Sequence, residues 1–89
     1  MNFIEELYRR QLMVAVRTDT TEQAYRAAVA CAEGGIKFIE ITSSVPDALE
    51  VIGKLSKDRR CTVGAGTILH TEDVKKALRA GAQYIVREL

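Results

Sequence analysis

A single carboxylate, Glu40, interrupts the apolar run that follows a glycine turn in residues 34–42. The run is rich in β-branched and aromatic residues and is too short for an ordinary helix, so it predicts a strand buried on both faces of a parallel sheet. A carboxylate in such a strand has lost most of its water. This is unfavourable by several kcal/mol unless the charge is paired, neutralised or placed at a solvated strand end.

Two explanations of Glu40 stay open from the residues alone. In the structural one, Glu40 forms an ion pair with a basic neighbour such as Arg17, or it lies at the exposed tip of its strand. In the functional one, the apolar strand favours the protonated carboxyl, so that Glu40 acts as a general acid or base near neutral pH. Structural ion pairs also perturb pKa values, so the sequence pattern by itself does not decide between the two explanations.

Other candidate binding residues also follow predicted strands. Arg17 comes directly after the apolar residues 12–16, Thr42 ends the strand of Glu40, and Gly66 and Thr67 end a third apolar segment. Parallel α/β folds bind ligands where the carboxyl ends of the strands release their loops, so these groups are expected to converge on one edge. Arg17 can bind a carboxylate or phosphate in fork geometry, and Thr67 can hydrogen-bond the same anion.

Cofactor and metal motifs are not indicated. The glycines Gly64 and Gly66 lack the third glycine of a dinucleotide fingerprint, which argues against a nicotinamide or flavin cofactor. Cys31 and Cys61 stand far apart without a CxxC pair or clustered histidines, which predicts neither a zinc site nor a disulfide. His70 is interpreted as a surface residue or a neighbour of a helix cap. We therefore expect no cofactor and no metal.

The elements that must position these residues alternate regularly along the chain. Strands are predicted at residues 12–16, within 34–42, at 61–63 running into 64–67, and at 83–86. A short amphipathic helix is expected near residues 3–8. Three longer helices follow the first three strands: one capped by Thr20 or Thr21 and stopped by Gly34, one with Pro46 in its first turn, and one capped by Thr71 and ended by residues 80–82.

This alternation predicts α/β crossovers between parallel strands in one unit spanning residues 1–89. An internal echo, residues 35–39 against 81–85, supports successive βαβα units. A sheet segment with strands in sequence order and a doubly wound, flavodoxin-like sheet both fit the periodicity, and strand order distinguishes them.

Composition narrows the classes of partner. Thirteen Lys and Arg balance twelve Asp and Glu to a formal charge of +1, which gives no electrostatic footprint for nucleic acid or an anionic membrane. No apolar stretch approaches the ~18 residues of a membrane span, and the first ten residues do not read as a signal peptide. A cytoplasmic protein with reduced thiols is therefore expected.

The ordered motifs of this chain resemble those in the first half of the 2-keto-3-deoxy-6-phosphogluconate (KDPG) and 4-hydroxy-2-oxoglutarate aldolase family. The matching blocks are collinear over essentially the whole chain. They are Val14-Ala15-Val16-Arg17, Glu33-Gly34-Gly35, Ile39-Glu40-Ile41-Thr42, Val45-Pro46-Asp47-Ala48, Val63-Gly64-Ala65-Gly66-Thr67 and Ala80-Gly81-Ala82-Gln83-Tyr84-Ile85-Val86.

The resemblance implies the N-terminal half of a (β/α)8 TIM barrel, with about four parallel strands, crossover helices and the extra N-terminal helix. It implies a class I aldolase, usually trimeric, that cleaves a sugar-acid phosphate or keto acid to pyruvate and an aldehyde through a Schiff base, without a metal. Glu40 would be the general acid/base. Arg17 and Thr67 would contact the substrate, with Gly66 and Thr42 beside them.

The chain departs from the family pattern in two places. The family's Schiff-base lysine lies on a later strand, beyond Leu89, so the isolated chain is expected to be inactive. Ser44 stands where some members place a substrate-binding arginine. A half barrel is also expected to expose an apolar inner face and two open edges, which favour association. The alternatives are a non-catalytic half-barrel assembly and a small α/β anion-binding module.

Overall fold

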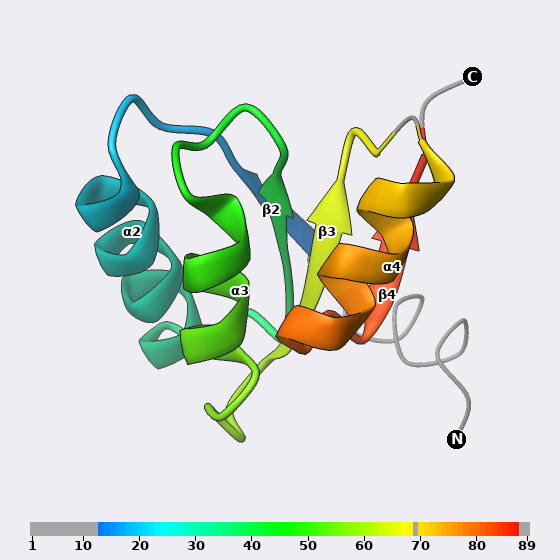
Figure 1. Ribbon diagram of the computed structural model, residues 1–89. Helices are drawn as coiled ribbons and strands as arrows, with labels where there is room; N and C mark the ends of the chain where they lie inside the picture. Colours follow the sequence, from blue (N-terminus) through cyan, green and yellow to red (C-terminus); the bar gives the residue numbers. More distant parts are fainter. Residues whose placement is uncertain (1–12, 69, 88–89) are drawn as a thin grey trace.

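The computed structural model describes residues 13–68 and 70–87, in which strands and helices alternate strictly (Figure 1). The helix expected near residues 3–8 lies outside the described residues. The elements are β1 (Met13–Val16), α2 (Thr21–Glu33), β2 (Phe38–Thr42), α3 (Ala48–Leu55), β3 (Thr62–Gly66), α4 (Thr71–Ala80) and β4 (Tyr84–Val86).

The four strands form one parallel sheet in the order β1-β2-β3-β4. Neighbours in sequence are therefore neighbours in space, as in a segment of a barrel. The doubly wound alternative is wrong, because that topology requires a reversal of strand order at a switch point. The fold is half of a β/α barrel, as the family resemblance implies, and β1 and β4 are the two edges of its sheet.

The helices all cover one face of the sheet, and the apolar core lies between them (Figure 1). The α2 helix presents small residues to the sheet at i, i+4 spacing, so its backbone approaches closely. The core side chains of β2 are Ile39 and Ile41, both 0% exposed. Each such burial stabilises the fold by about 1.5–3 kcal/mol relative to an exposed side chain.

Cap residues explain most helix boundaries. Thr20 caps α2, since its hydroxyl accepts a hydrogen bond from the Gln23 amide at 3.1 Å, and Gly34 ends that helix. Gly81 ends α4 with φ of 119°, a conformation that favours glycine. The longest helix, α2, has 13 residues, and no helix within 13–68 and 70–87 has the length and apolar character needed to cross a membrane.

Two predicted helix starts are wrong. The α3 helix begins at Ala48 after Asp47, whose backbone is left-handed, so Pro46 precedes the helix instead of lying in its first turn. The cap position of α4 belongs to His70, and Thr71 is its first helical residue. The loop before α3 is longer than predicted, because the chain turns at the left-handed Asp47 before the helix begins. The α4 helix instead begins one residue earlier than predicted.

The sheet face opposite the helices, here called the inner face, is only partly open. Alternation along the strands places Phe38, Glu40 and Thr42 of β2 on this face. Phe38 is 1% exposed, and its ring meets the ring of Tyr84 edge-on at a centroid distance of 6.4 Å. Met13, on the edge strand β1, is 41% exposed. The expectation of an exposed apolar inner face is therefore wrong at Phe38 and Thr42 of β2.

Candidate active site

Glu40 lies in the middle of the inner face. It is the third of the five residues of β2 and is half-buried, so it does not occupy an exposed strand tip. The strand register places Ala15, Glu40, Gly64 and Tyr84 in one row across the sheet. This position in mid-strand excludes the explanation that Glu40 lies at an exposed strand tip.

The Glu40 carboxylate lies directly against Gly66 on β3. A Cβ built on Gly66 would overlap Glu40 Oε1, so the carboxylate can keep this position only while residue 66 has no side chain. The sequence predicts that the glycines of β3 allow a close approach. The structure identifies the approaching group as Glu40 itself.

Tyr84 is a second titratable group beside Glu40, and sequence reasoning treated it only as part of a strand. A Cβ built on Gly64 would overlap the Tyr84 ring, which therefore lies flat across β3. Burial raises the pKa of the Tyr84 phenol well above its usual value, and the negative charge of Glu40 raises it further. The phenol is thus protonated at neutral pH. The internal echo that aligns Phe38 with Tyr84 was the one sequence signal pointing to it.

Hydroxyl groups gather where β2 and β3 release their loops. Thr42, the last residue of β2, is 1% exposed, and its Oγ1 shares a hydrogen bond of 2.8 Å with Ser44 Oγ. The next residue, Ser43, donates from its hydroxyl to the Thr67 carbonyl oxygen at 2.9 Å. Thr67 itself has φ of 59°, in the left-handed region. Strained backbone of this kind concentrates at functional sites.

Three hydrogen bonds join the loops at this edge one after another. The Thr21 hydroxyl at the start of α2 donates to the Pro46 carbonyl oxygen at 2.6 Å. The Ser43 amide donates to the Gly66 carbonyl oxygen at 3.0 Å, and the Ile68 amide donates to the Val86 carbonyl oxygen at 3.3 Å. The carboxyl edge of the sheet is therefore a connected rim.

The structure brings four of the five predicted site residues together. Glu40, Thr42, Gly66 and Thr67 lie on the adjoining ends of β2 and β3, with Thr42 and Gly66 paired in register. Arg17 follows β1 directly and is exposed. Since Val16 pairs with Ile41, Arg17 stands at the level of Thr42 on the neighbouring strand, and β2 lies between it and Gly66.

The lysines of the described residues lie away from this site. Lys37 immediately precedes β2, at the amino ends of the strands, and its carbonyl accepts a hydrogen bond from the Thr62 amide. Lys54 and Lys75 lie on helices, within 3.6 Å and 3.7 Å of Glu50 and Glu72 respectively. Within 13–68 and 70–87 there is also no group of three His, Cys, Asp or Glu that could hold a metal ion.

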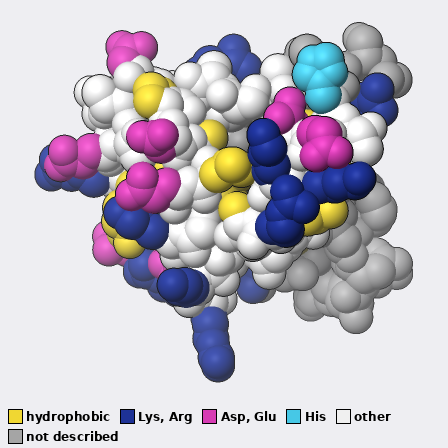
Figure 2. Space-filling model, in the orientation of Figure 1, with side chains coloured by type: hydrophobic (Ala, Val, Ile, Leu, Met, Phe, Trp, Pro, Cys, Tyr) yellow, Lys and Arg dark blue, Asp and Glu magenta, His cyan; other side chains and the backbone are white. Residues whose placement is uncertain are grey.

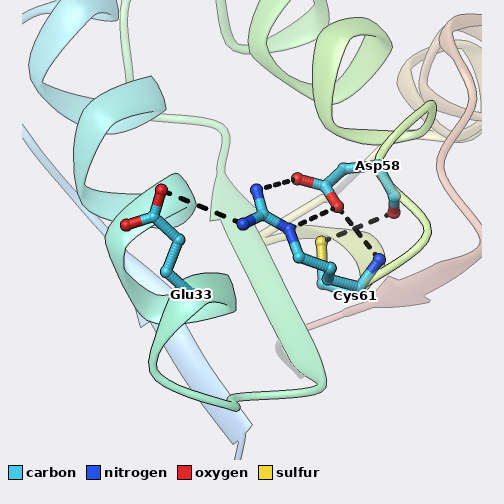
Figure 3. Close-up of polar contacts among 4 residues, drawn as sticks. Glu33, Asp58 and Cys61 are labelled. Atoms are coloured by element: carbon cyan, nitrogen blue, oxygen red, sulfur yellow. Dashed lines mark hydrogen bonds and ion pairs between the residues drawn. The ribbon is translucent and has the colours of Figure 1, made fainter.

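The amino ends of the strands carry a different polar cluster, which fastens the loop before β3 (Figure 3). Arg60 binds Asp58 in a fork, with nitrogen–oxygen distances of 3.0 and 2.7 Å, and its other nitrogen lies 3.9 Å from Glu33. The Arg60 side chain and backbone hydrogen bonds lower the pKa of Asp58 to about 2. This end of a β/α barrel serves stability, and we assign the cluster that role.

A cavity of about 470 Å³ lies on the helix side of the sheet, between α3 and α4. Its floor includes Ile41 and Ala65, whose side chains alternate with Glu40 and Gly66 and so point away from the site. Figure 2 views the molecule from this side, where acidic and basic side chains are interspersed around small apolar patches. The cavity borders the candidate site at Ser43, which also lines it.

Comparison with known proteins places this arrangement in a family. A sequence model described as "KDPG and KHG aldolase" matches residues 3–88. A 2-dehydro-3-deoxy-phosphogluconate aldolase of Treponema pallidum is 32% identical over 87 residues, which are 97% of this chain and 41% of the relative. The protein of the same name from Pseudomonas aeruginosa is 34% identical over 85 residues, 93% of this chain and 39% of the relative.

Structural comparison agrees. The crystal structure of 2-keto-3-deoxy-6-phospho-gluconate aldolase from Zymomonas mobilis superposes with a TM-score of 0.65 at 28% identity, over 84% of this chain and 35% of that one. The chain thus spans about two fifths of the length of the curated relatives above. The sequence match over residues 3–88 and the shared half-barrel fold show that this chain belongs to the KDPG and KHG aldolase family.

Proposed function

We propose that the inner face of this chain forms the proton-transfer half of a class I aldolase active site. The observation that carries the proposal is the Glu40 carboxylate, held in mid-strand against Gly66 on the sheet face away from the helices. A general acid or base has to be held within reach of the reacting group, and the fixed, half-buried position of Glu40 supports this role. The substrate class is a 4-hydroxy-2-oxo acid, such as KDPG or 4-hydroxy-2-oxoglutarate.

In this proposal a lysine amine condenses with the C2 carbonyl of the substrate and water leaves, which gives a protonated Schiff base. Glu40 then removes the proton of the C4 hydroxyl, the C3–C4 bond breaks, and its electron pair moves onto the nitrogen as an enamine. The aldehyde departs. Glu40 returns a proton to C3, and water releases pyruvate from the lysine.

We assign the substrate-binding residues from their charge and from their position at the carboxyl edge of the sheet. Arg17 is an exposed cation at this edge of the sheet and would hold the substrate carboxylate. Thr42 and Thr67 would hydrogen-bond the neighbouring oxygens, while Gly66 leaves room for them. Tyr84, protonated beside Glu40, can donate a hydrogen bond on the same face but cannot act as the nucleophile.

We place the nucleophilic lysine outside residues 1–89. By strand alternation Lys37 belongs to the helix-covered face with Ile39 and Ile41, at the amino end of β2, so it faces away from Glu40. Residues 1–89 would then be one incomplete barrel domain. The whole assembly would be a cytoplasmic trimer, as the resemblance implies, with the edges β1 and β4 paired to the rest of the barrel.

Borohydride trapping tests whether the nucleophilic lysine lies outside this chain while Glu40 lies within it. The 89-residue chain is incubated with pyruvate and borohydride, alone and together with the remaining C-terminal segment of the Zymomonas mobilis relative. We expect no covalent adduct on this chain and, in the mixture, an adduct on the added segment. Glu40→Gln should abolish turnover in the mixture and leave assembly intact. A pyruvate adduct on a lysine of the 89-residue chain would overturn the proposal.

A further inference from the structure

Thr67 adopts a backbone conformation that its side chain disfavours. Its φ is 59°, and among the non-glycine residues of 13–68 and 70–87 only Asp47 shares a positive φ. A β-branched residue in the left-handed region is an outlier, because its Cβ substituents crowd the backbone. Such a conformation persists only where the surroundings hold it in place.

Ser43 supplies that restraint from the adjoining strand end. Its amide donates to the Gly66 carbonyl oxygen at 3.0 Å, and its hydroxyl donates to the Thr67 carbonyl oxygen at 2.9 Å. The first bond fixes the peptide plane before the Thr67 Cα, and the second fixes the plane after it. Since those two planes define φ and ψ of Thr67, one serine holds both angles.

The restraint changes where the end of β3 can direct its side chains. An extended continuation of β3 would place Thr67 on the helix-covered face with Ala65, because successive side chains alternate between faces. The left-handed residue breaks that alternation immediately after Gly66. No partner within the described part of the chain is hydrogen-bonded to the Thr67 hydroxyl, which is therefore available to a ligand.

We propose that Ser43 is a positioning residue, which holds Thr67 in its left-handed conformation so that Thr67 can bind an oxygen of a 2-oxo acid beside Glu40. This inference rests on the proposed function for its ligand, but the backbone restraint is independent of it. Ser43 itself does not touch the substrate, so its contribution passes through the angles of Thr67.

NMR on the 89-residue chain tests separately whether Ser43 holds the backbone of Thr67 and whether the chain binds a 2-oxo acid. The three-bond amide–Hα coupling of Thr67 reports φ, and a pyruvate titration followed by amide shifts gives the dissociation constant. We compare the unsubstituted chain with Ser43→Ala and Ser43→Thr. The control is Ser56→Ala, which removes a similar hydroxyl–carbonyl bond of 2.7 Å to Gly53 at the end of α3, away from the site.

Ser43→Ala should move the Thr67 coupling away from its left-handed value and weaken pyruvate binding about fivefold, the change expected for one hydrogen bond. Ser43→Thr should restore both. Ser56→Ala should change neither, even if it lowers the unfolding midpoint. An unchanged Thr67 coupling in Ser43→Ala would overturn the inference. If the unsubstituted chain fails to bind pyruvate, the proposed function is contradicted instead, and the coupling still decides whether Ser43 holds Thr67.

Discussion

The carboxylate of Glu40 on β2 occupies the space that a side chain at Gly66 on β3 would need. The position of the carboxylate therefore depends on residue 66 having no Cβ. The two residues lie on neighbouring strands of the parallel sheet. A glycine that would otherwise look like a weak point of a strand therefore has a specific role, since it sets the position of the carboxylate.

Gly66→Ala should displace the Glu40 carboxylate and leave the fold intact. The atoms that the new methyl group would meet belong to the end of a flexible side chain, which can rotate away. We expect a loss of stability below about 1.5 kcal/mol, typical of mild overpacking, together with loss of pyruvate binding. Urea unfolding measures the first quantity and NMR titration the second.

Gly64→Ala is the matched control on the same strand. Its new methyl group would meet the ring of Tyr84, which is rigid and packed against Phe38. The free energy of unfolding should fall by about 1–3 kcal/mol, more than for Gly66→Ala. Equal losses for the two variants would contradict the difference between a flexible and a rigid neighbour.

The ionisation of Tyr84 should report the charge of Glu40. Burial, then the Glu40 charge, raises the pKa of this phenol in the folded chain. Tyr84 should therefore ionise above the ordinary range of a tyrosine in an absorbance titration, with Tyr84→Phe identifying its step. Because the folded pKa exceeds the unfolded value of 10.0, the associated stability is present below pH 10 and is lost as pH rises above it.

Glu40→Gln tests the cause of that shift. The substitution removes the negative charge and keeps the shape, so the pKa of Tyr84 should fall while staying above its ordinary value, since burial is the larger cause. A Tyr84 pKa that does not move would mean that the two groups are not electrostatically coupled.

The fork between Asp58 and Arg60 should make stability depend on acid pH. Hydrogen bonds from Arg60 lower the pKa of Asp58 from 3.8 to about 2. A lowered pKa gives stability that is present above about pH 4 and is lost as pH falls toward 2. Asp58→Asn should therefore make the unfolding midpoint less dependent on pH between about pH 4 and about pH 2. Glu33→Gln is the control, because the 3.9 Å Arg60–Glu33 pair is largely exposed and should contribute little.

The two cysteines should differ in alkylation rate. Cys61 is 5% exposed, and burial raises the pKa of its thiol, which lowers the fraction of reactive thiolate. Cys31 is half-buried on the α2 helix. Iodoacetamide at pH 8 should modify Cys31 first, as read by peptide mass spectrometry, and the difference should disappear in urea. Faster labelling of Cys61 in the folded chain would contradict this order.

Local chemistry made much of the fold predictable. Thr20, Gly35 and Gly81 lie at helix ends because the backbone there needs a capping oxygen or a left-handed residue. The alternation of apolar strands and helices likewise predicted a parallel sheet, and the family resemblance predicted its strand order. The starts of α3 and α4 were missed because they depend on loop angles, such as the left-handed Asp47, which no residue type dictates.

The site was predictable in its residues but not in its contacts. Glu40 stood out because a charge in an apolar strand is rare, whereas Ser43 and Tyr84 are ordinary residues in a loop and a strand. Their importance arises from the register, which sets Tyr84 level with Glu40, and from the loop geometry, which brings Ser43 to Thr67. Both depend on pairing between segments distant in sequence.

The glycines of β3 also bear on how such a site can change over time. At Gly64 and Gly66 this strand gives the inner face no side chains, so a carboxylate from one neighbour and a ring from the other meet across bare backbone. Substitutions on β2 and β4 would change those two groups directly, whereas a new side chain at either glycine would first displace the carboxylate or the ring. Changes at these two positions of β3 would therefore reach the site through its neighbours.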